Sequence, residues 1–343
     1  MAKTIIHFGP PKTGTSAIQK WLLENRDTLK SKRIFYPEHV LDKNGISSGN
    51  VASVFPNPKV DKLKQARPNK LRLKELCREN KCNTLLLSSE IFMRKLPELA
   101  TLFPNAVFIG YIRPTFELLE SDYNQVVKRH GETKPFSENN RSAMWQLEML
   151  ESVIPTIGKE RFKLRAYSKS AFYNNDLVKD FLSNLDPELA TGADVNSSRE
   201  INPSYTLEAL ETKRWLNQFN IERPIQQKLD KHLQGLSMGT QKYSLLPEKE
   251  FIKQKADSIK ALSEFNTKFH IEGFEKLIAD ITEKKQKPFN DQVISDDVFE
   301  SIIRSFMEAL PECIEQFRCI AVDKDNDIRN PERKDIIKQL LPS

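Results

Sequence analysis

The first two dozen residues constrain the fold of this chain more than any other stretch. Residues 4–8 form an apolar, β-branched run that predicts a buried strand. A loop of sequence GPPKTGTS follows over residues 9–16. The apolar spacing of Ile18, Trp21 and Leu22 then predicts a helix that ends near Asn25. The chain therefore begins with a strand, a tight loop and a helix, in that order.

This loop has the chemistry of an anion site. A helix that opens from a tight loop leaves backbone N–H groups without intrahelical partners, and its dipole adds partial positive charge there. Gly14 allows close approach to the backbone, and Lys12 adds a full charge. A Walker A loop has its lysine directly after the second glycine, followed by Ser or Thr. Here Lys12 precedes Gly14 by two residues, so the pattern of nucleoside triphosphatases is not met.

A second stretch has related features about a hundred residues later. Residues 106–112 read as a buried strand, Arg113-Pro114 stops it, and residues 115–128 have the apolar spacing of a helix. Ser121 falls on the face of that helix opposite the apolar stripe. An arginine at a strand end presents a planar fork of donors to a phosphate.

Together the two stretches resemble the PAPS-dependent sulfotransferases, where PAPS is 3'-phosphoadenosine 5'-phosphosulfate. The family's loop P-K-[ST]-G-[TS]-[TS] is matched by Pro11, Lys12, Thr13, Gly14, Thr15 and Ser16. Its second motif, a strand-end Arg followed eight residues later by Ser, is matched by Arg113 and Ser121. The resemblance implies that the loop binds the 5' end of PAPS, that Lys12 stabilises the oxygen between phosphate and sulfate, and that Arg113 and Ser121 bind the 3'-phosphate.

The chain also departs from the best-known members of that family. Ala17 stands where cytosolic members have a tryptophan that stacks on adenine, and no clear copy of their late Arg-Lys-Gly phosphate loop is present. Both differences favour the bacterial or carbohydrate-modifying branch.

Glu90 is the candidate general base. Residues 84–88 predict a buried strand that ends in Ser88-Ser89-Glu90. Ligands of open α/β sheets gather beyond the carboxyl ends of the strands, so Glu90 is expected near the Lys12 loop. A partly desolvated glutamate can take the proton of an attacking hydroxyl. The alternative is a solvated acid that caps the next helix, and His130 is the second candidate base. His7, inside the first strand, is expected to be a packed core histidine.

The pattern of elements predicts an α/β fold, a parallel sheet flanked by helices, with a largely helical C-terminal part. The resemblance implies that the sheet belongs to a P-loop-like sulfotransferase core. A short strand over 33–37 is expected beside the first strand, and 38–70 is read as a long loop on the substrate side. Further expected elements are helices over 71–80, 143–157, 177–185, 207–219 (opened by a Ser204 cap), 248–285 and 295–318, and a strand over 161–167. We expect a PAPS-binding core over 1–195 and a helical region over 196–343 that completes the core and the acceptor site.

Composition agrees with a protein that binds small anions. The 343 residues carry a net charge of +6, 38% are hydrophobic and 29% are charged, which is ordinary for a globular protein. The positive excess is too diffuse to indicate nucleic acid. No window is long enough to span a bilayer, and the four cysteines lack the spacing of a zinc site. We expect a cytoplasmic enzyme with reduced thiols and no metal.

These observations lead to one functional hypothesis and two alternatives. The hypothesis is transfer of the sulfuryl group of PAPS to a hydroxyl or amine of an acceptor, most simply a glycan, with Lys12 and Glu90 as catalytic residues. An ATP-dependent small-molecule kinase is one alternative, and a non-catalytic PAPS-binding protein is the other. The sequence identifies neither the acceptor nor the oligomeric state.

Overall fold

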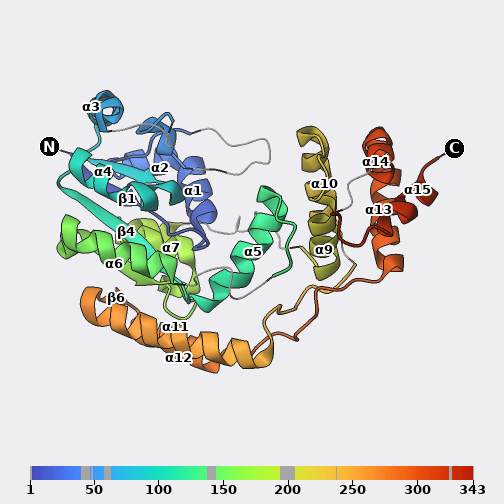
Figure 1. Ribbon diagram of the computed structural model, residues 1–343. Helices are drawn as coiled ribbons and strands as arrows, with labels where there is room; N and C mark the ends of the chain where they lie inside the picture. Colours follow the sequence, from blue (N-terminus) through green and yellow to red (C-terminus); the bar gives the residue numbers. More distant parts are fainter. Residues whose placement is uncertain are drawn as a thin grey trace. The chain divides into compact units, whose positions relative to one another are not determined.

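The computed structural model describes residues 2–39, 47, 49–57, 63–136, 144–193, 205–236, 238–323 and 327–342, and it contains a six-stranded parallel sheet (Figure 1). Neighbouring strands follow the order β2-β3-β1-β4-β5-β6, and every pair is parallel. The strands are β1 Lys3–His7, β2 Ile34–Phe35, β3 Thr84–Ser88, β4 Ala106–Ile112, β5 Phe162–Ala166 and β6 Ile271–Glu272. The predicted α/β fold, a parallel sheet flanked by helices, is confirmed.

The chain divides into two compact units. The first comprises residues 1–118, 143–201 and 254–284, and the second comprises 119–142, 202–253 and 285–343. Within the first unit lie α1 Thr15–Glu24, α2 Arg26–Ser31, α3 Leu63–Glu79, α4 Leu96–Leu102, α6 Trp145–Ile157, α7 Leu177–Ser183, α8 Pro187–Gly192 and α12 Phe274–Glu283. The second unit contains α9 Leu207–Leu216, α10 Arg223–Gly235, α13 Asp296–Ala309, α14 Ile314–Ala321 and α15 Arg333–Leu340. Two helices, α5 Phe116–His130 and α11 Glu248–Phe269, contain residues of both.

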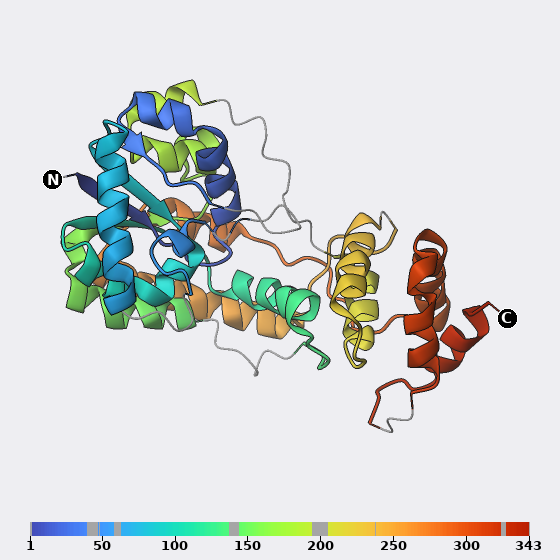
Figure 2. The ribbon, with the colours of Figure 1, turned by 90° about the horizontal axis from the view of Figure 1, so that it is seen from above.

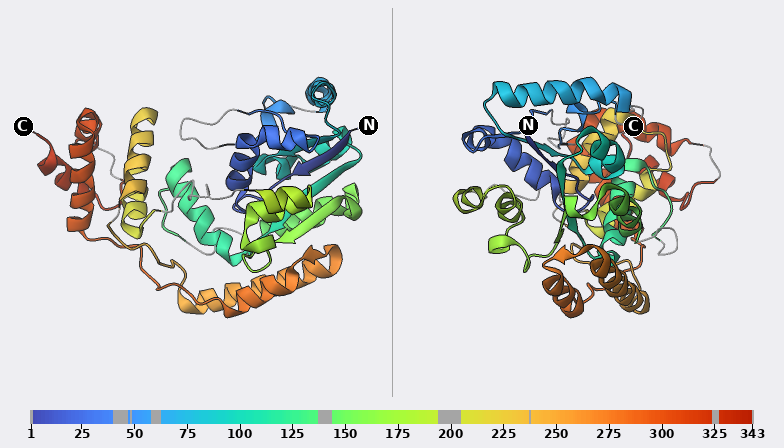
Figure 3. Two further views of the ribbon diagram at one scale, coloured as in Figure 1. Left: turned by 180° about the vertical axis from the view of Figure 1, so that it is seen from behind. Right: turned by 90° about the vertical axis from the view of Figure 1, so that its left-hand side faces the viewer.

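Each unit has its own apolar core. On one face of the sheet, Ile5, Leu86 and Ile109 pack against side chains of α1, α2, α7 and α8. Helices α1 and α7 lie side by side on this face (Figure 3). In the second unit, α9 packs against α10 and α13, and α14 packs against α15 (Figure 2). Helix α9 is buried around most of its circumference, which makes it the central helix of this unit.

Sheet pairing corrects one expectation at the edge of the first unit. The short strand predicted over 33–37 forms as β2, but it pairs with β3 in the register Ile34↔Thr84 and does not adjoin β1. The position beside β1 is taken by β3 on one side and β4 on the other. Local periodicity predicts that a strand exists, whereas its neighbour depends on contacts that are distant in sequence.

The structure also corrects or refines several helical predictions. Residues 63–70, read as part of a loop, belong to α3 despite Pro68, because Ala66, Leu73 and Cys77 form a buried stripe. The stretch over 248–285 forms two helices with strand β6 between them, and the stretch over 295–318 forms α13 and α14 with a 3-10 turn, Pro311–Cys313, between them. The cap of α9 is Thr206, whose side chain accepts a hydrogen bond from the Ala209 N–H. The Ser204 cap, like residues 40–46 and 58–62 of the predicted loop, lies outside the described residues.

Candidate functional site

The order of the strands creates a switch point at β1. The chain leaves β1 toward the outer strand β2, while it leaves β4 in the opposite direction toward β5. In open parallel sheets ligands bind in the crevice at such a point, beyond the carboxyl ends of the strands. The loop over 9–16 follows β1, and Arg113 directly follows β4. The two stretches singled out in the sequence therefore flank the same switch point.

The loop has an unusual backbone conformation. Its Gly9–Pro10 peptide is cis, and Lys12 and Gly14 have φ values of 67° and 70°, in the left-handed region. The Thr13 hydroxyl donates a hydrogen bond of 2.5 Å to the Pro10 carbonyl across the turn. Left-handed residues in a turn are typical of backbone concavities that bind anions. The loop is thus shaped by its own backbone and by the buried Thr13.

The N-terminus of α1 opens directly from this loop. Gly14 is the N-cap and provides no side chain, while its carbonyl accepts hydrogen bonds from Ala17 and Ile18. Within the described part of the chain, the N–H groups of Thr15 and Ser16 have no hydrogen-bond acceptor. Such N–H groups, together with the helix dipole, favour an anion at this position. A phosphate or sulfate group fits these donors chemically.

Arg113 fastens the loop to the end of β4. Its Nη1 donates to the Lys12 carbonyl at 2.9 Å, and its Nε donates to Glu117 at 2.9 Å. The guanidinium also lies 5.5 Å from the centre of the Tyr167 ring. Burial alone would raise the pKa of Glu117, but Arg113 and the Lys284 ammonium, which also contacts it, lower that pKa. The arginine therefore already has partners in the chain, and its predicted contact with a 3'-phosphate stays a prediction.

Glu90 lies at the tip of β3, next to the start of the loop. The Ser89 N–H bonds to the His7 carbonyl at 3.0 Å, which continues the pairing of β3 with β1. A Cβ atom added to Gly9 would lie 3.3 Å from the Glu90 Cα. The glutamate is half-buried and begins a short 3-10 helix, Glu90–Lys95, which the Ser89 side chain caps. The structure thus brings together Glu90 and the loop that contains Lys12.

Polar contacts with Asn50 and His7 also hold the carboxyl end of β3. Asn50 accepts a 2.8 Å hydrogen bond from the Ser88 N–H and donates its own N–H to the Ser88 carbonyl at 3.0 Å. The Ser88 hydroxyl also contacts His7 Nδ1 at 2.8 Å. His7 is fully buried, and burial lowers its pKa to about 3, so it is neutral at physiological pH. It is a packed core histidine, in agreement with the sequence.

Two residues of the site were missed by sequence reasoning. Tyr167 directly follows β5, and its hydroxyl lies 3.4 Å from where a Gly14 Cβ would be. Leu177, the first residue of α7, would meet that Cβ at 2.3 Å. Tyr167 could have been found from its position at the carboxyl end of a strand, because the same position indicated Arg113 and Glu90. No local signal in the sequence marks Leu177.

The other predicted residues lie elsewhere. Ser121 is on α5, in the part of that helix that belongs to the second unit, so its role at the site stays a prediction. His130 is exposed at the end of the same helix and also belongs to the second unit. The four cysteines are free thiols. Among the described residues, no helix combines the length and the apolar character that crossing a bilayer requires.

Fold and loop geometry define an α/β protein with an anion-type loop at its switch point. No protein-family model matches the chain, and neither does any curated protein. One similar solved structure is described as the crystal structure of a sulfotransferase from Alicyclobacillus acidocaldarius. It is 12% identical, with a TM-score of 0.40, over 79% of this chain and 97% of that one.

Proposed function

We propose that this protein transfers the sulfuryl group of PAPS to a hydroxyl or amine of an acceptor, most simply a glycan. One observation carries the proposal: the sequence Pro11-Lys12-Thr13-Gly14-Thr15-Ser16 forms the loop between β1 and α1, at the switch point, beside Glu90 and Arg113. A lysine two residues before the glycine distinguishes this loop from that of nucleoside triphosphatases.

The proposed reaction is an in-line displacement at sulfur. The oxygen or nitrogen of the acceptor forms a bond to sulfur while the bond between sulfur and the phosphate oxygen breaks, and adenosine 3',5'-bisphosphate leaves. The acceptor proton passes to the Glu90 carboxylate. Lys12 and the N–H groups at the start of α1 stabilise the charge that develops on the leaving oxygen. Arg113 keeps the loop in position through the Lys12 carbonyl.

A ligand-dependent stability measurement tests the donor. A ligand that binds only the folded state raises the unfolding temperature with its concentration. We expect adenosine 3',5'-bisphosphate to raise it in the presence of EDTA, and ADP with magnesium to have a smaller effect. A shift with ADP and magnesium alone would instead favour the kinase.

Two substitutions test the catalytic roles. We expect Lys12→Ala to reduce release of adenosine 3',5'-bisphosphate from PAPS by about a hundredfold or more, because it removes charge stabilisation in the transition state.

Glu90→Gln should abolish acceptor-dependent release and leave bisphosphate binding unchanged. A fully active Glu90→Gln variant would move the general base to another residue, with His130 tested next. A wild type that binds the bisphosphate and transfers nothing across a broad acceptor panel would be the non-catalytic binding protein.

The two roles of Arg113 can be separated with a matched ligand pair. If its guanidinium binds the 3'-phosphate, Arg113→Ala should weaken binding of adenosine 3',5'-bisphosphate and leave that of adenosine 5'-monophosphate unchanged. If Arg113 acts only by holding the Lys12 carbonyl, both affinities should fall by a similar factor. Titration calorimetry with both nucleotides distinguishes these results.

A further inference from the structure

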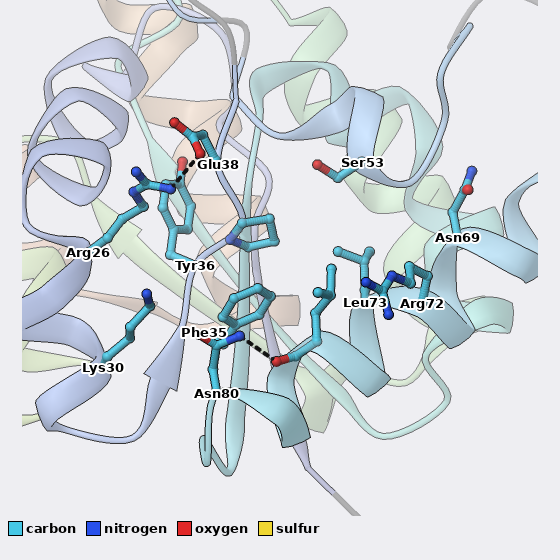
Figure 4. Close-up of a pocket in the computed structure, with 12 residues that line it drawn as sticks. Arg26, Lys30, Phe35, Tyr36, Glu38, Ser53, Asn69, Arg72, Leu73 and Asn80 are labelled. Atoms are coloured by element: carbon cyan, nitrogen blue, oxygen red, sulfur yellow. Dashed lines mark hydrogen bonds and ion pairs between the residues drawn. The ribbon is translucent and has the colours of Figure 1, made fainter.

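A pocket of about 440 Å³ lies at the β2 edge of the sheet. Figure 4 shows it between α2 on one side and α3 on the other, with the residues that follow β2 between them. None of the residues proposed for the PAPS site lines it. Its volume is in the range of small-molecule sites. The pocket therefore lies outside the proposed PAPS site.

The lining combines an apolar floor with polar walls. Five apolar or aromatic residues come from the end of β2 and from α3; they are Phe35, Tyr36, Pro37, Leu73 and Leu76. Seven residues of the walls are polar or charged; they are Arg26, Lys30, Glu38, Ser53, Asn69, Arg72 and Asn80. A site for an apolar ligand has few polar groups. The lining of this pocket offers both kinds of group, which suits a ligand with one apolar face and several hydrogen-bonding groups around it, as in a sugar ring.

Two amides of the pocket are oriented as acceptors. Asn69 donates its Nδ2 to the Val54 carbonyl at 3.1 Å, and Asn80 donates its Nδ2 to the Leu76 carbonyl at 2.8 Å. The second of these bonds is visible in Figure 4. In each case the Oδ1 atom is left to accept a hydrogen bond from a ligand hydroxyl.

Three cations face the pocket, and their carboxylate partners are exposed. Arg26 pairs with Glu38 at 3.1 Å across the rim, and Glu38 is 73% exposed. Lys30 is 3.9 Å from the fully exposed Asp27. Arg72 pairs with Glu75 and Glu79 along α3, both about half exposed. Ion pairs in contact with solvent contribute little, so an anionic ligand replaces these carboxylates at low cost.

We propose that this pocket binds a sugar ring that carries a carboxylate or sulfate group. The apolar face of the ring packs on Phe35 and Pro37, its hydroxyls donate to Asn69 and Asn80, and its anionic group lies against Lys30 or Arg72. The proposal does not depend on sulfuryl transfer, because it concerns binding alone.

Saturation-transfer NMR on the ligand tests this with D-glucuronate and D-glucose as matched probes. We expect D-glucuronate to bind with a Kd on the order of 1 mM, a weak affinity suited to an open pocket. D-Glucose should bind at least about tenfold more weakly, because it cannot form the charge-assisted hydrogen bonds. Equal binding of the two sugars, or no saturation transfer from the protein to D-glucuronate, would overturn the proposal.

Substitutions locate the binding. At least one of Lys30→Gln and Arg72→Gln should weaken D-glucuronate binding by about threefold or more, since it removes the charged donor of the anionic group. Arg78→Gln removes the same charge from an exposed position of α3 outside the pocket, and should have no effect. Binding that is unchanged in both pocket variants, or that adenosine 3',5'-bisphosphate displaces, would place the sugar elsewhere and refute this site.

Discussion

Gly14 ends the loop with a φ of +70° and N-caps α1, and its missing side chain leaves the space that Leu177 fills. Both features exclude a larger residue here. A Cβ would strain the left-handed backbone and would meet the Leu177 Cδ2 at 2.3 Å.

We therefore expect Gly14→Ala to lower the free energy of unfolding by about 1 to 3 kcal/mol. Gly192→Ala is the control: nothing lies within 4 Å of the added Cβ and Gly192 belongs to helix α8, so this change should not lower the free energy of unfolding. In the double variant with Gly14→Ala and Leu177→Ala, the loss of unfolding free energy should be smaller than the sum of the two single losses, because the shorter side chain removes the clash. Urea unfolding of these three variants and of Leu177→Ala alone measures this. Additive costs would show that Leu177 and Gly14 are not coupled.

Among the elements, α7 is anchored to the sheet by a buried carboxylate. Asp180 accepts hydrogen bonds from the Tyr111 hydroxyl, from two nitrogens of Arg165 and from the Tyr173 N–H. Arg165 also pairs with Glu272, whose side chain is 62% exposed, against 1% for Asp180. The same arginine therefore has one buried and one exposed partner.

We expect Asp180→Ala to destabilise the protein by about 3 to 5 kcal/mol, because it removes the buried partner of Arg165 and leaves only the exposed Glu272. Glu272→Ala should cost less than about 1 kcal/mol, since that pair is in contact with water. Thermal unfolding of the two variants compares them directly. Equal losses would mean that burial does not determine the contribution of these pairs.

Helix α9 contains a buried lysine that links stability to pH. Lys213 is 3% exposed, contacts the Asn217 side chain, and burial lowers its pKa to about 8, against the opposing attraction of Asp230. Its ordinary pKa is 10.5. Between these two values the unfolded chain holds a proton that the folded chain has released. The free energy of unfolding should therefore rise with pH across this window.

Lys213→Met removes this contribution. We expect the variant to be more stable than the wild type at pH 7, and the difference to shrink as pH rises from about 8 to 10.5. Lys231→Met, at an exposed position of α10, is the control and should follow the wild-type curve. Urea unfolding across this pH range measures the three curves. A constant difference between Lys213→Met and the wild type would contradict the assigned pKa.

At the scale of the whole molecule, the sheet is completed by residues that are far away in sequence. Strand β6 pairs with β5, and α12 packs on β5. The Ser258 hydroxyl accepts hydrogen bonds from the N–H and the hydroxyl of Thr115, three residues after the end of β4. These contacts come from residues 254–284, which belong to the first unit.

A fragment of residues 1–195 should consequently fail to form a stable core. It would expose the edge of β5 and leave the partners of Ser258 unsatisfied, and an open apolar edge promotes aggregation. Proton NMR dispersion and the cooperativity of thermal unfolding report on this. A soluble fragment with sharp, cooperative unfolding would show that β6 and α12 are dispensable, and that the predicted core over 1–195 is self-sufficient.

The sequence by itself determined the local elements that carry the candidate site. The β1 strand, the loop with Lys12, helix α1, strand β4 and the Arg113 turn were all predictable, because hydrophobic periodicity and turn residues are properties of neighbouring residues. The rule for parallel sheets also predicted that Glu90 would lie near the loop.

Only the tertiary structure decided how those elements are joined. It paired β2 with β3, inserted β6 within a stretch of helical periodicity, and turned Arg113 toward the Lys12 carbonyl and Glu117. It also placed Leu177 against Gly14. Each of these depends on free energy gained between residues that are distant in sequence. A local sequence pattern does not reveal which pairing gains that free energy, because the same periodicity is compatible with several neighbouring strands or helices.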